Sequence, residues 1–357
     1  MKKIQFFPTW SENELHVDIM RRHDDGSCAD DVCLEFNDQD VVELRNLNRN
    51  DESIVHVFLP QYYGLDVVLE NGSIVTHDKI EAKSGFVCLH TNCGSLSVNK
   101  VRTERIELSA RALNINAVAE GSVHAECETI VAKQILGPYC KVLCTNDIDI
   151  ASLYVSTSEI SSISGRVNIG TNQGSSKIRN AGDVRIDSAV GELDIVSDEG
   201  HVSVHLDKCI RGAEHSLSSS TGKVNITAAT PCTTRADFSI FPDCDGEIIC
   251  DTNGSFETET RTEFHAQDGV SESLVGVIRD SGASSLSLTT SGKISEEGRN
   301  MAAILSAGAS DNDSDEMCII KATASRGIEF TAKSWRQMME ERMMRGSMMR
   351  GSFEGSD

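Results

Sequence analysis

Residues 182–204 read GDVRIDSAVGELDIVSDEGHVSV, and the fold follows from the pattern in this stretch. The order glycine, polar, aliphatic, polar, aliphatic occurs in it three times, as GDVRI, GELDI and GHVSV. Successive side chains of a β-strand point to opposite faces, so each repeat predicts a short strand with one aliphatic face. Glycines recur here at close and regular intervals, at positions 165, 174, 182, 191 and 200. Such spacing predicts short strands joined by tight glycine corners.

Aliphatic residues recur along the chain with a second, longer step. Val167, Val184 and Val202 form one such series, and Leu193 lies midway in its last interval. Earlier in the chain the same step relates Leu96, Leu113, Ile130 and Ile148, and also Ile106 and Val123. Two interleaved series with one common step indicate two strands per coil. We therefore predict an all-β fold, a single-stranded parallel β-helix or solenoid with about 17–18 residues per coil.

The composition agrees with a narrow aliphatic interior. Aromatic residues make up 5% of the chain and prolines number 5, whereas valine, isoleucine, serine, threonine and glycine are frequent. Such a composition favours strands whose buried face carries aliphatic rather than aromatic side chains. One coil alone buries too few of them to offset the entropy lost in ordering its backbone. Neighbouring coils must stabilise one another, so the repetition is a physical requirement of the fold.

Three segments are predicted along the chain. Residues 1–51 lack the repeat and are predicted to cap its N-terminal end, residues 52–333 form the β-solenoid, and residues 334–357 form a short capping helix and a disordered Met/Arg/Gly/Ser tail. Ser334 is the expected N-cap of that helix. A helix that docks on a membrane or on a calmodulin-like partner is the alternative interpretation of the same segment. Bare terminal strands pair edge to edge, so end-to-end self-association is a further expectation.

Charge and cysteine usage restrict the partner classes. The formal net charge of −22 repels phosphate, so we expect neither nucleic acid nor an anionic membrane as partner. No apolar run is long enough for a transmembrane segment, and the N-terminus has neither a secretory nor a mitochondrial leader pattern, so a cytoplasmic protein is expected. The 12 cysteines are then mostly reduced, and because no CxxC pair occurs, we expect neither a metal nor a cofactor.

One cluster of outward residues is the candidate site. The repeat step predicts two columns on the surface, Arg166–Asp183–His201 and Gly170–Asp187–His205. Together with the intervening arginine they give a patch of Asp183, Arg185, Asp187, His201 and His205. Such a patch has the residue types of an acid/base pair or of a metal site. His201 and His205 are about 13 Å apart along a strand, too far to chelate one ion. We favour solvated cross-strand charge pairs and expect no catalytic residue.

The repeats resemble a known family. SGRVNIG, AGDVRIDSAVGELDIVSDEGHVSVHL and TGKVNIT are similar to the adhesin-like β-strand-repeat domain, a domain of unknown function. The entry LPQYYGLDVVLENG and the ending IKATASRGIEFTAKSW resemble its animal branch of uncharacterised single-domain proteins. The similarity runs from about residue 50 to Trp335. It implies a single-stranded parallel β-helix without assigned catalytic residues, and the animal relatives imply a mitochondrial location as an alternative.

These observations lead to two functional hypotheses. The first is a non-enzymatic interaction or scaffold protein that presents strand faces and corner loops to an unknown protein partner. A regular aliphatic interior without a convergent polar cluster favours it. The second is a carbohydrate-binding or carbohydrate-cleaving β-helix protein that uses the patch around Asp183 and Asp187, because clustered aspartates on one strand face are typical of pectin-cleaving β-helices.

Overall fold

In the computed structural model, the described residues form an all-β fold in two compact units, Met1–Ile160 and Ser161–Asp357. The described residues are 3–9, 16–20, 32–36, 42–46, 54–60, 64–210, 212–230, 234–240, 247–251, 256–265, 271–280 and 318–334. No helix within this part of the chain is long and apolar enough to cross a membrane. The predicted C-terminal helix and tail lie outside the described residues, apart from Ser334, which ends a strand.

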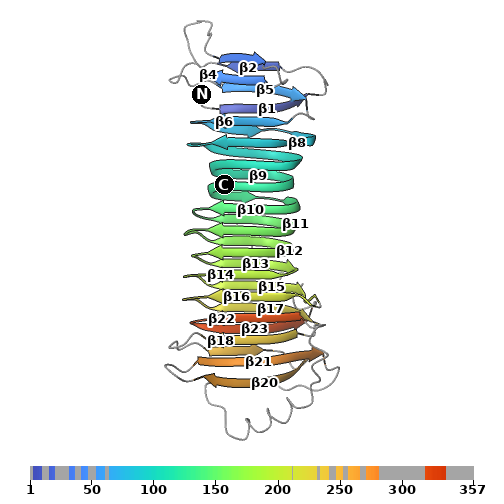
Figure 1. Cartoon of the computed structure of the whole chain (residues 1–357), viewed down its shortest axis with the longest axis vertical. Helices are drawn as coiled ribbons and strands as arrows, with labels where there is room; N and C mark the ends of the chain where they lie inside the picture. The colour runs from blue at the N-terminus through green and yellow to red at the C-terminus, as the bar shows by residue number, and fades with distance from the viewer. Residues whose placement is uncertain are drawn as a thin grey trace, which may run out of the picture. The chain divides into compact units, whose positions relative to one another are not determined.

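The described part of the first unit consists of strands β1 to β11, the last of which ends just beyond its boundary (Figure 1). Their bounds are β1 (Lys3–Thr9), β2 (His16–Met20), β3 (Val32–Phe36), β4 (Val42–Asn46), β5 (Ile54–Pro60), β6 (Leu65–Leu69), β7 (Ser73–Thr76), β8 (Lys79–Thr91), β9 (Ser95–Ala132), β10 (Ile135–Cys144) and β11 (Ile148–Ser162). The long β9 winds through corners, and the Lys133 amide donates to the Ile115 carbonyl at 2.9 Å, one coil earlier.

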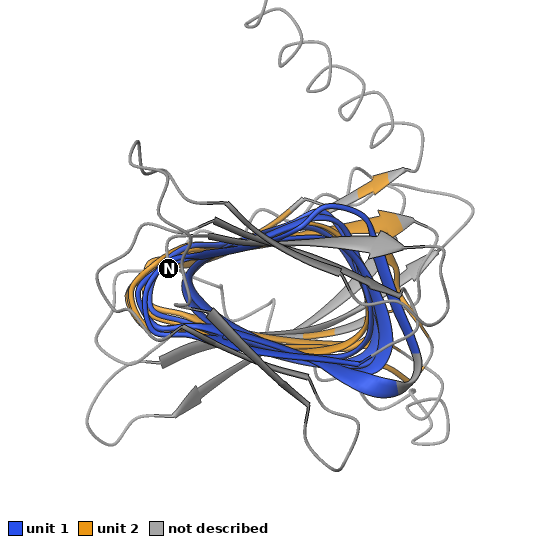
Figure 2. Ribbon diagram, turned by 90° about the horizontal axis from the view of Figure 1, so that it is seen from above, with its two compact units in different colours: residues 1–160 blue, residues 161–357 orange. Residues whose placement is uncertain are grey.

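The described part of the second unit consists of strands β12 to β23 (Figure 1). They are β12 (Val167–Asn180), β13 (Val184–Val190), β14 (Leu193–Ser197), β15 (Val202–Lys208), β16 (Glu214–Ser219), β17 (Val224–Thr230), β18 (Thr234–Ile240), β19 (Glu247–Asp251), β20 (Phe256–His265), β21 (Ser271–Asp280), β22 (Cys318–Ala324) and β23 (Gly327–Ser334). Seen along the stacking direction, the coils of each unit follow a flattened ring (Figure 2).

The predicted parallel stacking is confirmed in the second unit. Val167 of β12 pairs with Val184 of β13, which pairs with Val202 of β15, all in parallel register. Each of the three valines is at most 1% exposed. The column continues to Val224 of β17, and the coil between Val202 and Val224 is longer than the predicted step. Extra residues enter at the corners, because the strands themselves keep their register.

The first unit stacks in the same way. Val87 of β8 lies between Leu65 of β6 and Ile106 of β9, in parallel register with both. Further along, Ile148 of β11 pairs with Ile130 of β9, as the repeat step predicts. All but Leu65 are at most 1% exposed. Aliphatic side chains of consecutive coils therefore share one interior in this unit as well.

Glycine corners keep the coils close together. A Cβ placed on Gly200 would overlap the backbone of Gly182, the corner glycine of the preceding coil. A Cβ on Gly222 would likewise meet the Gly200 carbonyl. These corners need glycine because of close backbone approach, whereas Gly191 also has a φ of 124°, which L side chains rarely adopt. The predicted corners at Gly182, Gly191 and Gly200 thus have two different physical causes.

The last two described strands of the chain lie between earlier coils. β22 pairs in parallel with β16 on one side and with β18 on the other, and β23 does the same with β17 and β19. β17 ends at Thr230 and β18 begins at Thr234, but these two strands are not neighbours in the stack. The coil of residues 318–334 lies between them (Figure 1). Its inward residues are fully enclosed, with Ile320 and Phe330 both 0% exposed.

The N-terminal strand is also inserted into the stack. β1 pairs in parallel with β5 and with β7, so that Ile4 is opposite Val55 on one side and Ile74 on the other. Antiparallel strands then follow the parallel ones: β2 pairs with β5 in the first unit, and β21 pairs with β18 and β20 in the second. Antiparallel pairing occupies strand edges that would otherwise be open to another chain.

We predict that the inserted coil is essential for stability. Phe330→Ala removes a fully buried ring that lies 5.7 Å from the ring of Phe238, centroid to centroid, and should lower the free energy of unfolding by about 3–5 kcal/mol. Glu329→Ala, at the adjacent exposed position, is the matched control and should change it by less than about 0.5 kcal/mol. Urea titration followed by circular dichroism measures both. Equal effects would contradict the insertion of β23.

A second prediction concerns the corners. Gly200→Ala should destabilise the fold by about 3 kcal/mol, because the new methyl group has to displace backbone of the neighbouring coil. Gly85→Ala is the control, since its Cβ would meet the Ala82 Cβ at 3.4 Å and the Gly64 Cα at 3.9 Å, which are ordinary contacts. Thermal unfolding of the two variants should separate them clearly. A Gly200 variant as stable as the Gly85 variant would show that the corners are not close-packed.

Candidate functional site

Two members of the predicted patch serve to join consecutive coils. The side chain of Asp183 accepts a hydrogen bond of 2.7 Å from the backbone amide of His201, one coil further on. His201 in turn accepts a 2.9 Å hydrogen bond at Nδ1 from the backbone amide of Lys223. The predicted column through Asp183 and His201 therefore exists. Its acceptor atoms satisfy backbone donors at the corner, which is a structural role.

The other members of the patch lie on the strand face. Arg185 and Asp187 of β13 form an ion pair of 2.7 Å, and His205 of β15 lies 3.3 Å from Asp207. Ser188 also hydrogen-bonds to Asp207. The predicted stacking of Asp187 on His205 is interrupted, because the register of β13 and β15 shifts between Ile186 and Ala189.

The patch therefore divides into separate pairs. Asp183 and His201 belong to the corner, whereas Arg185 and His205 contact carboxylates on their own strands. Across the described residues, no group of three or more His, Cys, Asp or Glu side chains is placed to hold a metal ion. Surface pairs of this kind contribute little to stability and do not form a convergent site.

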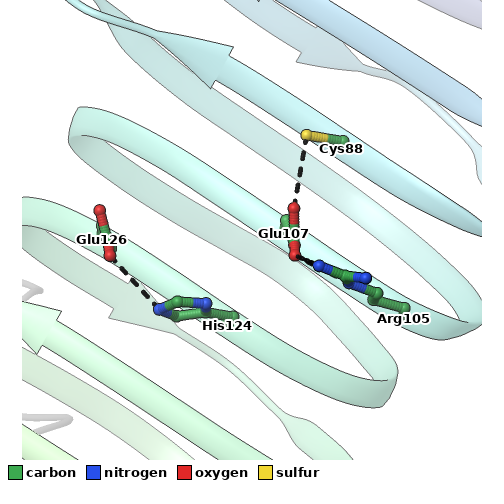
Figure 3. A network of polar contacts seen from close by, with 5 residues as sticks. All are labelled: Cys88, Arg105, Glu107, His124 and Glu126. Atoms are coloured by element: carbon green, nitrogen blue, oxygen red, sulfur yellow. Dashed lines mark hydrogen bonds and ion pairs between the residues drawn. The ribbon is translucent and has the colours of Figure 1, made fainter.

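A second polar cluster lies on the outer face of the first unit (Figure 3). Glu107 of β9 accepts a hydrogen bond from Cys88 of β8 at 3.8 Å, and another from Nε of Arg105 at 2.8 Å. On the next turn of β9, His124 lies 3.4 Å from Glu126, so that its ring and the guanidinium of Arg105 occupy neighbouring turns (Figure 3). Sequence reasoning did not find this cluster, because the coils that join β6 to β8 and β8 to β9 are longer than the predicted step.

The environment of Cys88 favours the protonated thiol. Burial, followed by the negative charges of Asp66 and Glu107, raises the pKa of Cys88 to about 11. Register places Cys88 directly between these two carboxylates, since Asp66 pairs with it from β6 and Glu107 from β9. At neutral pH the Cys88 thiol is therefore mainly protonated, and its thiolate is scarce.

Exposed apolar side chains accompany this cluster. Phe86 of β8 is 48% exposed and pairs with Arg105, while Val68 of β6 is 67% exposed and shares the outward side of its strand with Asp66. We call the outward side chains of Asp66, Val68, Phe86, Arg105 and Glu107 the β6–β8–β9 face. On this face apolar groups lie among charged ones. The composition of the chain gave no sign that these apolar residues would point outward.

One histidine lies in the interior. His215 of β16 is 0% exposed, stands between Leu193 of β14 and Ile320 of β22, and has no hydrogen-bond partner for either ring nitrogen among the described residues. Burial lowers the pKa of His215 to about 4, against a smaller opposing effect of Glu192. The ring is therefore neutral at physiological pH. The alternating pattern of β16 could have revealed its inward position.

Buried hydroxyl groups at the corners were also missed. Ser197 donates to the Gly182 carbonyl at 2.9 Å and accepts from the Gly200 amide at 3.0 Å. Ser219 makes the same pair of bonds to Gly200 and Gly222, at 2.7 and 2.8 Å. The signal in the sequence is a serine three positions before the corner glycine. These hydroxyl groups add hydrogen bonds to backbone atoms at the corners.

Comparison with known proteins identifies a family. Residues 33–287 match the family model described as Toastrack DUF4097. Neither the curated proteins nor the solved structures contain a match to the chain.

We predict that His215 makes the fold acid-sensitive. Its pKa in the folded state, about 4, lies below the ordinary value of 6.5, so the unfolded chain binds a proton that the folded chain excludes. The stability contributed by a neutral His215 is complete above pH 6.5 and is lost as the pH falls toward 4. His215→Leu should remove roughly 3 kcal/mol of this pH dependence. Urea unfolding of both proteins from neutral to acidic pH measures it, and parallel curves would contradict the prediction.

Proposed function

The chain belongs to the Toastrack DUF4097 family, and we propose that it is a non-enzymatic interaction protein whose β6–β8–β9 face binds another protein. The observation that carries the proposal is the exposure of Phe86 and Val68 on strands that pair in parallel register. Large exposed apolar groups surrounded by charges are typical of protein-binding surfaces. Aromatic and arginine side chains are also the residues that most often dominate binding energy.

The chemistry of this face agrees with binding rather than catalysis. Arg105 is paired with Glu107, and Cys88 is kept as a neutral thiol beside two carboxylates. The stacked coils hold these side chains at fixed spacings, so little conformational entropy is lost when a partner binds. A partner with an apolar side chain for Phe86 and a basic group for Asp66 would fit the face. An adhesin-like role, membership of the animal branch and a cytoplasmic or mitochondrial location stay predictions, and binding at this face requires none of them.

The carbohydrate-binding hypothesis has weaker support. It relied on the patch around Asp183 and Asp187, but Asp183 accepts a backbone hydrogen bond and Asp187 is paired with Arg185. A sugar-binding or sugar-cleaving site needs polar groups that converge on one point. The pairs of the patch lie at a corner and on a strand face instead. The interaction hypothesis is therefore preferred.

Site-specific photocrosslinking tests the proposal. We predict that a photoreactive phenylalanine analogue at position 86 of the full chain captures a defined partner in cells. The same analogue at Ile163, which is 69% exposed in the second unit, is the matched control and should capture none. Arg105→Glu should reduce capture at position 86 by at least about tenfold, since reversing a charge in an interface weakens binding strongly.

Two results would contradict the proposal. One is equal capture at positions 86 and 163, which would indicate random collision. The other is capture at position 86 that Arg105→Glu leaves unchanged. Circular dichroism of the purified variants excludes unfolding as the cause of a loss.

A further inference from the structure

Two cysteines occupy paired positions in consecutive coils of the first unit. Cys144 of β10 is in parallel register with Cys127 of β9, at the end of a run that also pairs Val142 with Ala125. Their Sγ atoms are 2.9 Å apart, and both are free thiols. Cys127 is 9% exposed and Cys144 is 5% exposed. In-register neighbours in a sheet have Cα atoms about 5 Å apart, which lies within the range that a disulfide spans.

The pair lies at a corner of the coil rather than in the middle of a strand face. The amide of Thr145 donates to the Cys127 carbonyl at 3.1 Å, just as the amide of Ser220 donates to the Ser197 carbonyl at 2.9 Å in the second unit. Residues 145–147, which directly follow Cys144, are exposed. The corner position that holds serine in the second unit therefore holds two thiols here. A small oxidant has only a short path to them from solvent.

We propose that Cys127 and Cys144 form a redox pair that a hydroperoxide oxidises to a disulfide between consecutive coils. One thiol attacks the peroxide O–O bond, becomes a sulfenic acid and releases water from hydrogen peroxide. The sulfur of the second thiol then displaces the hydroxyl group of the sulfenic acid, which leaves as a second water. The two sulfurs give up two electrons in total, and hydrogen peroxide accepts them. No coil has to move, because the two sulfur atoms are already in contact.

The environment of the pair makes its oxidation slow. The hydrogen bond to Cys127, followed by burial, raises the pKa of Cys144, so its thiolate is scarce at neutral pH. Oxidation should therefore become faster as the pH rises. The bond would link two consecutive coils at the corner where Cys127 and Cys144 lie in register. Cys140 is also buried but pairs with Val123, so β9 offers it no thiol in register.

Differential alkylation of the full chain tests the proposal. The protein is treated with hydrogen peroxide at mildly alkaline pH, free thiols are blocked under denaturing conditions, and peptides are mapped by mass spectrometry. We expect a disulfide-linked peptide of Cys127 and Cys144 that dithiothreitol removes. Oxidation should raise the unfolding midpoint by about 5 °C. Cys93→Ser removes an exposed thiol and is the control that should keep both results, whereas Cys127→Ser should lose both.

Other outcomes would overturn the inference. They are a peptide map in which Cys127 and Cys144 remain fully alkylated while Cys93 is oxidised, or a linkage of either residue to a different cysteine. Mapping of the unmodified chain decides between these results even if Cys127→Ser fails to fold.

Discussion

Parallel, in-register pairing of consecutive coils governs the interior, the corners and the outer faces alike. It places Val184 in register with Val202 and fills the interior with stacked, mostly apolar side chains. The same pairing brings corner over corner, so Gly200 must lie against Gly182 and a serine hydroxyl must satisfy the backbone there. The stacked interior, the contact between corner glycines and the serine hydrogen bonds are all consequences of one spacing between strands, about 4.8 Å.

Segments from both ends of the chain complete coils that its middle leaves open. β1 enters between β5 and β7, and β22 and β23 enter between coils that follow one another directly in sequence. The edge of β16 and the edge of β18 that both contact β22 are therefore paired only after residues 318–324 have inserted between the two strands. Contacts between such distant residues slow folding, because loop closure has to precede them. They also tie these distant segments into the core.

The polar residues of the surface have two kinds of role. Asp183 and His201 bond to backbone of the next coil and so belong to the fold itself. The residues of the β6–β8–β9 face bond mainly to one another and leave Phe86 and Val68 open to solvent. In a solenoid of this kind stability resides in the columns and corners, and the binding that we propose is placed on a face. Membership of the Toastrack DUF4097 family agrees with this architecture and assigns no reaction to it.

The period, the two strands per coil, the corner glycines and the column of Val167, Val184 and Val202 all followed from the amino-acid pattern, because alternation and step are local properties of each coil. The order of the layers in the stack did not follow from this pattern. β23 follows β17 in the stack, with Ile328 in register with Val224. The sequence pattern does not predict this neighbour, because any other aliphatic residue would fit against Val224 equally well. Coil length also varies along the chain, so the partners of Cys88 and His215 could not be counted out from one step, whereas Cys127 and Cys144 are separated by the predicted step of 17 residues. Those contacts depend on which chemically similar strand edges meet, and that choice is made by the whole fold.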